Sequence, residues 1–154
     1  MYTHILRQFY RNCRIEGTVD FIFGDSATIF ENCLILLRPR QINSDKGSLD
    51  PVTAQGRTDP TEPTVFVFHN CTINGTEEYM RAYYANPKIY KGYLGWLWKM
   101  YSRGICINSY LGEAISPEGW MPWVEDFAQT IINTRNKKTT TMKSTLNIVK
   151  TNRF

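Results

Sequence analysis

Residues 9–15 read F-Y-R-N-C-R-I, and the same pattern of residue types occurs twice more along the chain. The other copies are I-F-E-N-C-L-I at 29–35 and V-F-H-N-C-T-I at 67–73. Each copy has the order apolar, aromatic, polar, Asn, Cys, polar, Ile. The offsets between copies are 20 and 38 residues. Such offsets correspond to one and two turns of a solenoid, with a long loop in the second interval.

The Asn-Cys pair at the centre of each copy is typical of a bend between two short strands. Asn tolerates the left-handed backbone conformation, and Cys is small enough to pack inside. Stacked copies would bury Cys, Ile and Phe in columns, and each coil would pair its backbone with the next at about 4.8 Å. Helical periodicity is poor before residue 76. The sequence therefore predicts an all-β fold, a parallel β-helix.

Between and after these copies the pattern is less regular. Residues 36–51 are predicted to form a loop that carries Arg38, Arg40 and Lys46. Residues 53–57 are predicted to form a strand that leads into a Thr-Asp-Pro turn. Residues 77–91 are rich in Tyr and are predicted to be irregular.

One carboxylate, Asp20, interrupts an apolar and β-prone stretch, I-E-G-T-V-D-F-I-F-G at residues 15–24. A lone Asp is depleted in strands and is costly to bury without partners. Asp20 could cap a turn at a strand end, or it could be a functional carboxylate. Asp25 follows Gly24 and precedes Ser26, which is typical of a turn residue.

The ten residues 15–24 resemble the active-site signature of the pectinesterase family. Further similarity to plant members covers residues 1–127 and is carried by R-Q-F-Y-R-N-C at 7–13, T-A-Q-G-R-T-D-P at 53–60, Y-L-G at 93–95, W-K at 98–99, Y-S-R at 101–103 and S-P-E-G-W at 116–120. An apparently longer loop near residues 42–50 interrupts the register. The resemblance implies a right-handed parallel β-helix. Since catalytic domains of this family are about twice as long, it also implies that the N-terminal half of such a domain is missing.

The resemblance implies hydrolysis of the methyl esters of cell-wall homogalacturonan (pectin) to pectate and methanol, without a cofactor. It assigns Asp20 as the nucleophile that attacks the ester carbonyl. It also implies that Phe23, Trp98 and Trp120 are aromatic residues of the substrate groove. For each of these three side chains, stacking on a sugar ring and packing in the core or at its rim both remain open.

Other catalytic groups of the family are not found at their expected places. The family's second Asp, the general acid and base, belongs to a Gln-Asp-Thr-Leu segment one coil upstream of the nucleophile, before Met1. The family's glutamines also lie upstream. The family's L-G-R-P-W motif reads L-G-W-L-W here, so that Trp96 replaces Arg and Leu97 replaces Pro. We therefore expect impaired activity.

Two hypotheses follow, and they belong to different classes. The first is a pectinesterase, and the alternative is a non-catalytic pectin-binding protein or a decayed pectinesterase-like fragment. Polygalacturonases and pectate lyases share the architecture but lack the signature, so they rank a distant third. Expected partners are pectin and a proteinaceous pectinesterase inhibitor, with neither nucleic acid nor a membrane among them.

The net charge of +4 comes from one end of the chain. Residues 134–154 hold six Lys or Arg and no acid, which leaves 12 basic and 14 acidic residues at positions 1–133. We expect a partial pectinesterase domain at 1–133 and a divergent, basic, disordered tail at 134–154. Such a tail is usually solvated, although it could touch a polyanion.

The four cysteines, at 13, 33, 71 and 106, lack the paired spacing of a zinc site, and only two histidines occur, so we expect no metal. If the coil register is right, Cys33 and Cys71 lie on neighbouring coils and could form a disulfide in an oxidising compartment. Cys13 is then the expected free, buried thiol.

The first residues contain no continuous apolar segment of a secretory signal peptide, and no run of 18 apolar residues occurs. The resemblance nevertheless implies an extracellular location in the cell wall. Two neighbouring sequences, N-C-T at 70–72 and N-G-T at 74–76, match the N-glycosylation pattern. They lie so close together that at most one is expected to be used.

Overall fold

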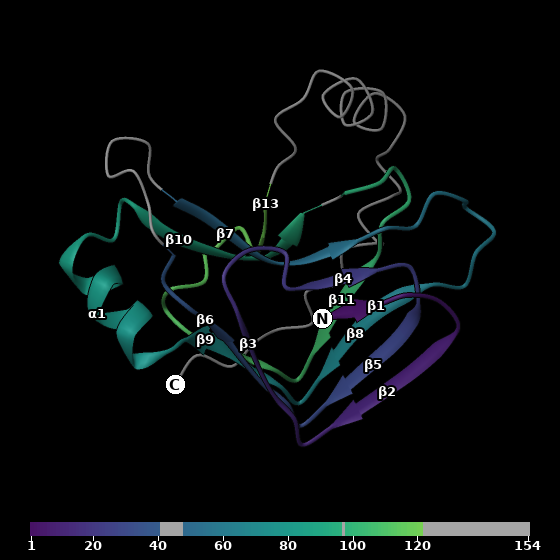
Figure 1. Cartoon of the computed structure of the whole chain (residues 1–154), viewed down its shortest axis with the longest axis horizontal. Coiled ribbons are helices and arrows are strands. Elements are labelled where there is room, and N and C mark those ends of the chain that lie inside the picture. Colours follow the sequence, from purple (N-terminus) through teal and green to yellow (C-terminus); the bar gives the residue numbers. More distant parts are fainter. Residues whose placement is uncertain (41–47, 97, 122–154) are drawn as a thin grey trace.

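Three parallel β-sheets wind into a solenoid (Figure 1). The structure, a computed structural model, describes residues 1–40, 48–96 and 98–121. The first sheet, sheet A, has the order β1 (Tyr2–Thr3), β4 (Ile22–Gly24), β7 (Ser48–Gln55), β10 (Tyr90–Trp96), β13 (Trp120–Met121). Sheet B contains β11 (Gly104–Ile107), β8 (Val65–His69), β5 (Ala27–Glu31) and β2 (Arg7–Arg11). Sheet C contains β12 (Tyr110–Leu111), β9 (Thr72–Gly75), β6 (Leu34–Leu37) and β3 (Arg14–Gly17). The predicted parallel β-helix is confirmed.

The corner between sheets B and C is built from one asparagine per coil. These residues adopt the left-handed conformation with φ between 49° and 56°, and they are Asn12, Asn32, Asn70 and Asn108. Asn70 Nδ2 donates a hydrogen bond to Asn32 Oδ1 at 2.7 Å. The repeat pattern therefore identified the corner correctly. It missed the fourth copy, I-C-I-N-S-Y-L at 105–111, because Ser109 stands where the other copies have Cys.

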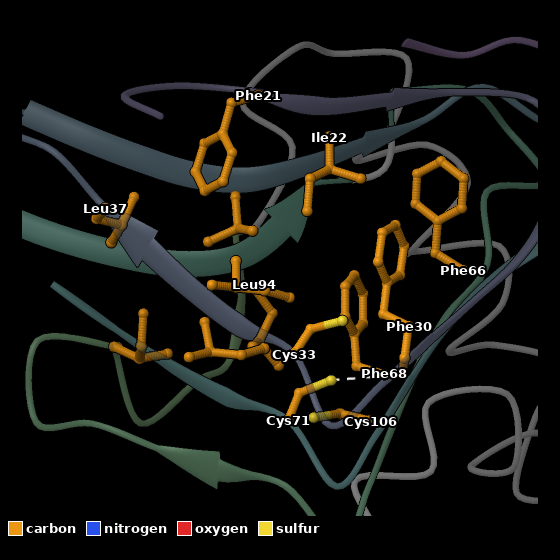
Figure 2. Packing of buried hydrophobic residues seen from close by; sticks show 14 of the residues in the cluster. Phe21, Ile22, Phe30, Cys33, Leu37, Phe66, Phe68, Cys71, Leu94 and Cys106 are labelled. Atoms are coloured by element: carbon orange, nitrogen blue, oxygen red, sulfur yellow. Dashed lines mark hydrogen bonds between the residues drawn. The ribbon is translucent and has the colours of Figure 1, made fainter. Parts of the chain in front are cut away.

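Aromatic residues of successive coils stack inside the solenoid, as the repeat predicts. Phe30 lies parallel to Tyr10 and Phe68, with ring centroids 5.3 and 4.9 Å apart. Figure 2 shows Phe30 and Phe68 beside Cys33 and Cys71. Apolar side chains that interdigitate in this way hold each coil against its neighbours, because burying them removes apolar surface from water.

The cysteines lie on neighbouring coils. The Thr72 amide donates to the Cys33 carbonyl at 2.9 Å, so Cys33 and Cys71 have adjacent places in the stack, as predicted. Both thiols are buried and free in the structure, and burial raises the pKa of Cys71 to about 11. Cys13 is free as expected but only half-buried, which corrects the prediction. It lies between β2 and β3, the outermost strands of their sheets in the described structure, so packing covers it from one side.

Residues 77–91 are not irregular, which is a second correction. Helix α1 spans Glu77–Ala85 and packs against the solenoid beside β9 and β10 (Figure 1). Thr76 caps it by accepting a hydrogen bond from the Tyr79 amide at 3.2 Å. Tyr79 is fully buried and donates to Asp50 Oδ2 at 2.9 Å. The helical pattern is weak because Tyr79 is the one side chain that α1 buries fully.

Both ends of the segment predicted as a loop at 36–51 belong to strands. Leu36 and Leu37 belong to β6, and β7 begins at Ser48 because it pairs with β10 along most of its length. The strand predicted at 53–57 is the second half of β7, which ends at Gln55.

Several predictions fall on residues outside the described ranges. Lys46, the substitution at Leu97, the boundary at residue 133 and the basic tail 134–154 all lie there. The only helix found in the described part of the chain, α1, is too short to span a membrane.

Candidate active site

Asp20 lies at a tight corner just before β4. Its φ of 49° is left-handed, and its amide donates to the Pro51 carbonyl at 2.8 Å. Gly17 makes this corner possible, because a Cβ at that position would lie 2.2 Å from Phe21 Cβ. Phe21 can therefore turn into the core while Asp20, one residue earlier, stays at the surface of the solenoid.

The Asp20 carboxyl group is half-buried and incompletely satisfied. Its Oδ1 is buried and has no hydrogen-bond partner among the described residues. Burial raises the pKa of Asp20 to about 6, and the side chain of Trp96 opposes this by hydrogen bonding, which favours the charged form. Burial is the larger cause. Trp96 stands where the family has Arg, and a neutral indole offsets the effect of burial only in part.

Phe23 and Trp96 lie in one row across sheet A. The register aligns Tyr2 with Phe23, Phe23 with Ala54, and Ala54 with Trp96. Residues in register on parallel strands share one face of the sheet. Phe23 is exposed and stacks on Tyr2 with centroids 5.2 Å apart. The row thus presents aromatic surface next to Asp20.

Trp98 continues this aromatic surface beyond the end of β10. The residue is 39% exposed. A Cβ added at Gly56 would lie 3.1 Å from the ring, so the backbone after β7 supports one face of Trp98. The ammonium group of Lys99 lies 4.9 Å from the ring centroid.

Trp120 is placed differently from Phe23 and Trp98. It is half-buried and packs against the hydrophobic core. A Cβ at Gly104 would lie 2.0 Å from its ring, and one at Gly95 would lie 3.0 Å from it. Trp120 therefore fills the space left by two glycines, and its remaining exposed edge is all that a ligand could contact.

A buried network behind this surface was missed by the sequence reasoning, which used T-A-Q-G-R only as a mark of resemblance. Gln55 Oε1 accepts from the amides of Arg57 and Arg103 at 3.1 and 3.0 Å. Its Nε2 donates to Asp25 Oδ1 at 3.2 Å. Asp25 lies in the bend after β4, as predicted for a turn residue. A buried amide within a strand was the available signal, because such a group needs partners.

Arg57 belongs to the same network and is almost completely buried. Its guanidinium donates to the carbonyls of Tyr101 at 3.3 Å and of Pro60. Together with Gln55, it fixes the loop that carries Trp98 onto the end of β7. Within the described residues, no three His, Cys, Asp or Glu side chains are grouped so as to hold a metal ion.

The family model called Pectinesterase matches residues 1–151. A probable pectinesterase/pectinesterase inhibitor 64 from Arabidopsis thaliana is 51% identical over 129 residues, which is 83% of this chain and 21% of the relative. Pectinesterase/pectinesterase inhibitor PPE8B from Prunus persica is 46% identical and is covered to 23% of its length. The chain thus spans about a fifth of these curated relatives.

Solved structures are similar over much of the chain. Pectin methylesterase from carrot superimposes with a TM-score of 0.71 at 38% identity, over 83% of this chain and 39% of that one. Pectin methylesterase from Aspergillus niger gives a TM-score of 0.63 at 28% identity, over 80% and 36% of the two chains.

Proposed function

Because the chain belongs to the pectinesterase family, we propose that it acts on the methyl esters of homogalacturonan, with Asp20 as nucleophile. The observation that carries this proposal is the state of Asp20. Its left-handed corner holds a half-buried carboxyl group with raised pKa beside the aromatic row of sheet A. Perturbed carboxylates in such places are typical of functional sites.

The proposed reaction begins when the ionised Asp20 attacks the ester carbonyl carbon. The bond from that carbon to the methoxy oxygen breaks, and the leaving methoxide takes a proton from water to give methanol. This leaves a mixed anhydride between Asp20 and the uronic acyl group. Hydroxide or water then adds to the uronic carbonyl carbon, the bond from that carbon to the Asp20 oxygen breaks, and Asp20 returns to its carboxylate form. Since the pKa of Asp20 is about 6, the nucleophilic form predominates only above that pH.

Phe23 and Trp98 are the proposed sugar-binding residues, because both expose aromatic faces on the side of the solenoid that carries Asp20. The planar face of an aromatic ring packs on the C–H bonds of a sugar ring. Trp120 is proposed to contribute chiefly by supporting this surface, through its packing on Gly95 and Gly104.

Trp96 supports the proposal that catalysis is impaired. A guanidinium would keep Asp20 ionised by its charge, whereas the indole only partly offsets burial. The same observation favours a second candidate function, non-catalytic binding of pectin. In that case the aromatic surface would bind homogalacturonan while Asp20 turned over little or no ester.

Methanol release from highly methylated pectin tests both candidates. We expect weak turnover that falls at least about 100-fold, to background, in Asp20→Asn, with unchanged pectin binding as the control for folding. In a protein of residues 1–154 alone, Trp96→Arg should lower the pKa of Asp20 without restoring full turnover, because these residues contain no Gln-Asp-Thr-Leu segment to supply the proton donor. Full turnover should need both Trp96→Arg and a preceding coil that carries that segment.

Two results would change these conclusions. Turnover that survives in Asp20→Asn would show that another residue is the nucleophile. Binding without any turnover in all variants, including the extended one, would favour the binding protein.

We further propose an extracellular location in the cell wall, a proteinaceous pectinesterase inhibitor as a second partner, and the division into a domain at 1–133 and a basic tail at 134–154.

A further inference from the structure

Two N-glycosylation patterns lie within the seven residues 70–76. The structure gives their two asparagines different surroundings. Asn70 and Asn74 are the only asparagines of the chain followed by any residue but Pro and then Ser or Thr. We propose that Asn70 carries an N-linked oligosaccharide and that Asn74 does not. This inference rests on the proposed function only in that both require export from the cell.

Asn70 is accessible at the edge of the solenoid. It is exposed, and its φ of 52° places it at the outer tip of the corner between β8 and β9. Its Nδ2 donates one hydrogen bond, to Asn32 Oδ1 at 2.7 Å. An amide nitrogen that carries a sugar keeps one hydrogen, so this bond and a glycan are compatible.

Asn74 is partly buried, and its side-chain amide packs against the next coil. Its Oδ1 is buried with no hydrogen-bond partner among the described residues. A Cβ at Gly112 on the next coil would lie 2.1 Å from that oxygen, so the Asn74 amide fills the space left by the missing side chain. In addition, the Thr76 hydroxyl caps helix α1. A sugar on Asn74 would displace β12 or α1, and the native coil could not form around it.

The equivalent corner residues show what sets Asn70 apart. Asn12, Asn32 and Asn108 have the same conformation and are likewise exposed, but Arg14, Leu34 and Tyr110 follow two positions later. Thr72 makes Asn70 the one corner asparagine with a complete pattern. Figure 1 shows this corner, between β8 and β9, on the side of the solenoid away from sheet A. A glycan there would leave the surface around Asp20 uncovered.

The modification is a group transfer from a lipid diphosphate-linked oligosaccharide, the co-reactant of the secretory pathway. A bond forms between Asn70 Nδ2 and the anomeric carbon of the sugar. The bond from that carbon to the diphosphate oxygen breaks, and the lipid diphosphate leaves with the electron pair. Nδ2 gives up one of its two protons.

The test is to express the full chain behind an export signal in a eukaryotic host and to map its glycans. Enzymatic release of the glycan in heavy-oxygen water converts each glycosylated Asn into labelled Asp, which mass spectrometry locates. We expect the label at Asn70 in most of the secreted monomer and none at Asn74. Thr72→Val should abolish the glycan while it retains the corner asparagine, and Asn74→Ser should leave the glycan unchanged.

Label at Asn74 in folded protein, or an unmodified Asn70, would overturn the inference. If the chain is retained in the cell, the monomer from the secretory compartment is mapped in the same way and judged by the same outcomes. The readout does not depend on ester hydrolysis, so a failure of the proposed catalytic function would leave it intact.

Discussion

The corner at Asn32 and the corner at Asp20 have the same left-handed backbone conformation, but their side chains differ in hydrogen bonding. Their φ angles are 53° and 49°. Asn32 is one of four stacked asparagines and accepts a hydrogen bond from the copy on the next coil. Both backbone amides donate to a carbonyl on the next coil, that of His69 for Asn32 and that of Pro51 for Asp20. The side chains differ, because the Oδ1 of Asp20 has no hydrogen-bond partner among the described residues.

This difference shows which polar residues of a repetitive fold are structural and which are available for function. Where a polar residue recurs in register, its copy on the neighbouring coil supplies a hydrogen-bond partner, and the pair stabilises the solenoid. Where it occurs once, its polar atoms remain available and its pKa is open to perturbation by burial. We therefore expect a catalytic group at the corner that does not repeat, which is the corner at Asp20.

Asn32→Val should have the largest effect on stability. A β-branched residue is strained at positive φ, and the substitution removes the acceptor for Asn70, so we expect a loss of about 2–3 kcal/mol in the free energy of unfolding. Asn32→Gly tolerates the conformation and should lose only about 1 kcal/mol. Urea denaturation of both variants measures the difference. Equal losses would mean that the left-handed corner does not discriminate between residue types.

Asp20→Asn should have a smaller effect, of opposite sign. Asn tolerates the same φ, and it removes a carboxyl group whose pKa is about 6 in the folded state and 3.8 for an unperturbed Asp. The folded state therefore binds the proton more tightly, and stability falls as the pH rises from about 4 through about 6. We expect the variant to be more stable at pH 8 by about 1 kcal/mol, allowing for screening of this half-exposed group.

Thermal unfolding at pH 4 and pH 8 checks this prediction. The gain should correspond to roughly 2–4 °C in Tm at pH 8 and should vanish at pH 4, where the carboxyl group of Asp20 is protonated in the folded state. A variant that is less stable than the parent at pH 8 would show that the Asp20 carboxylate makes a favourable contact.

Trp96→Phe should have the smallest effect. It retains an aromatic ring in the sheet A row but removes the indole N–H that favours the Asp20 carboxylate, so the pKa of Asp20 should rise further above 6. A carboxyl-carbon NMR titration measures it, with Trp98→Phe as the control that should leave the pKa unchanged. A lower pKa in Trp96→Phe would mean that the ring acts mainly by excluding water.

Local sequence patterns predicted the repeating part of the molecule well. The Asn-Cys copies identified the corner between sheets B and C and the stacked interior, because each coil repeats the same residue types at the same spacing. The resemblance placed Asp20 as the candidate nucleophile. Helix α1 was missed because its attachment to the solenoid depends on Tyr79 and on Asp50, which is distant in sequence.

The sequence by itself determined the solenoid, its asparagine corners and the family of the chain, since these depend on residue types at fixed spacing. Only the tertiary structure decided that Trp120 packs on Gly95 and Gly104, that burial raises the pKa of Asp20 to about 6, and that Asn70 is exposed while the Asn74 amide packs against Gly112. These properties depend on what the neighbouring coils place against each side chain. Burial and electrostatic environment are set by such long-range contacts, which no local pattern contains.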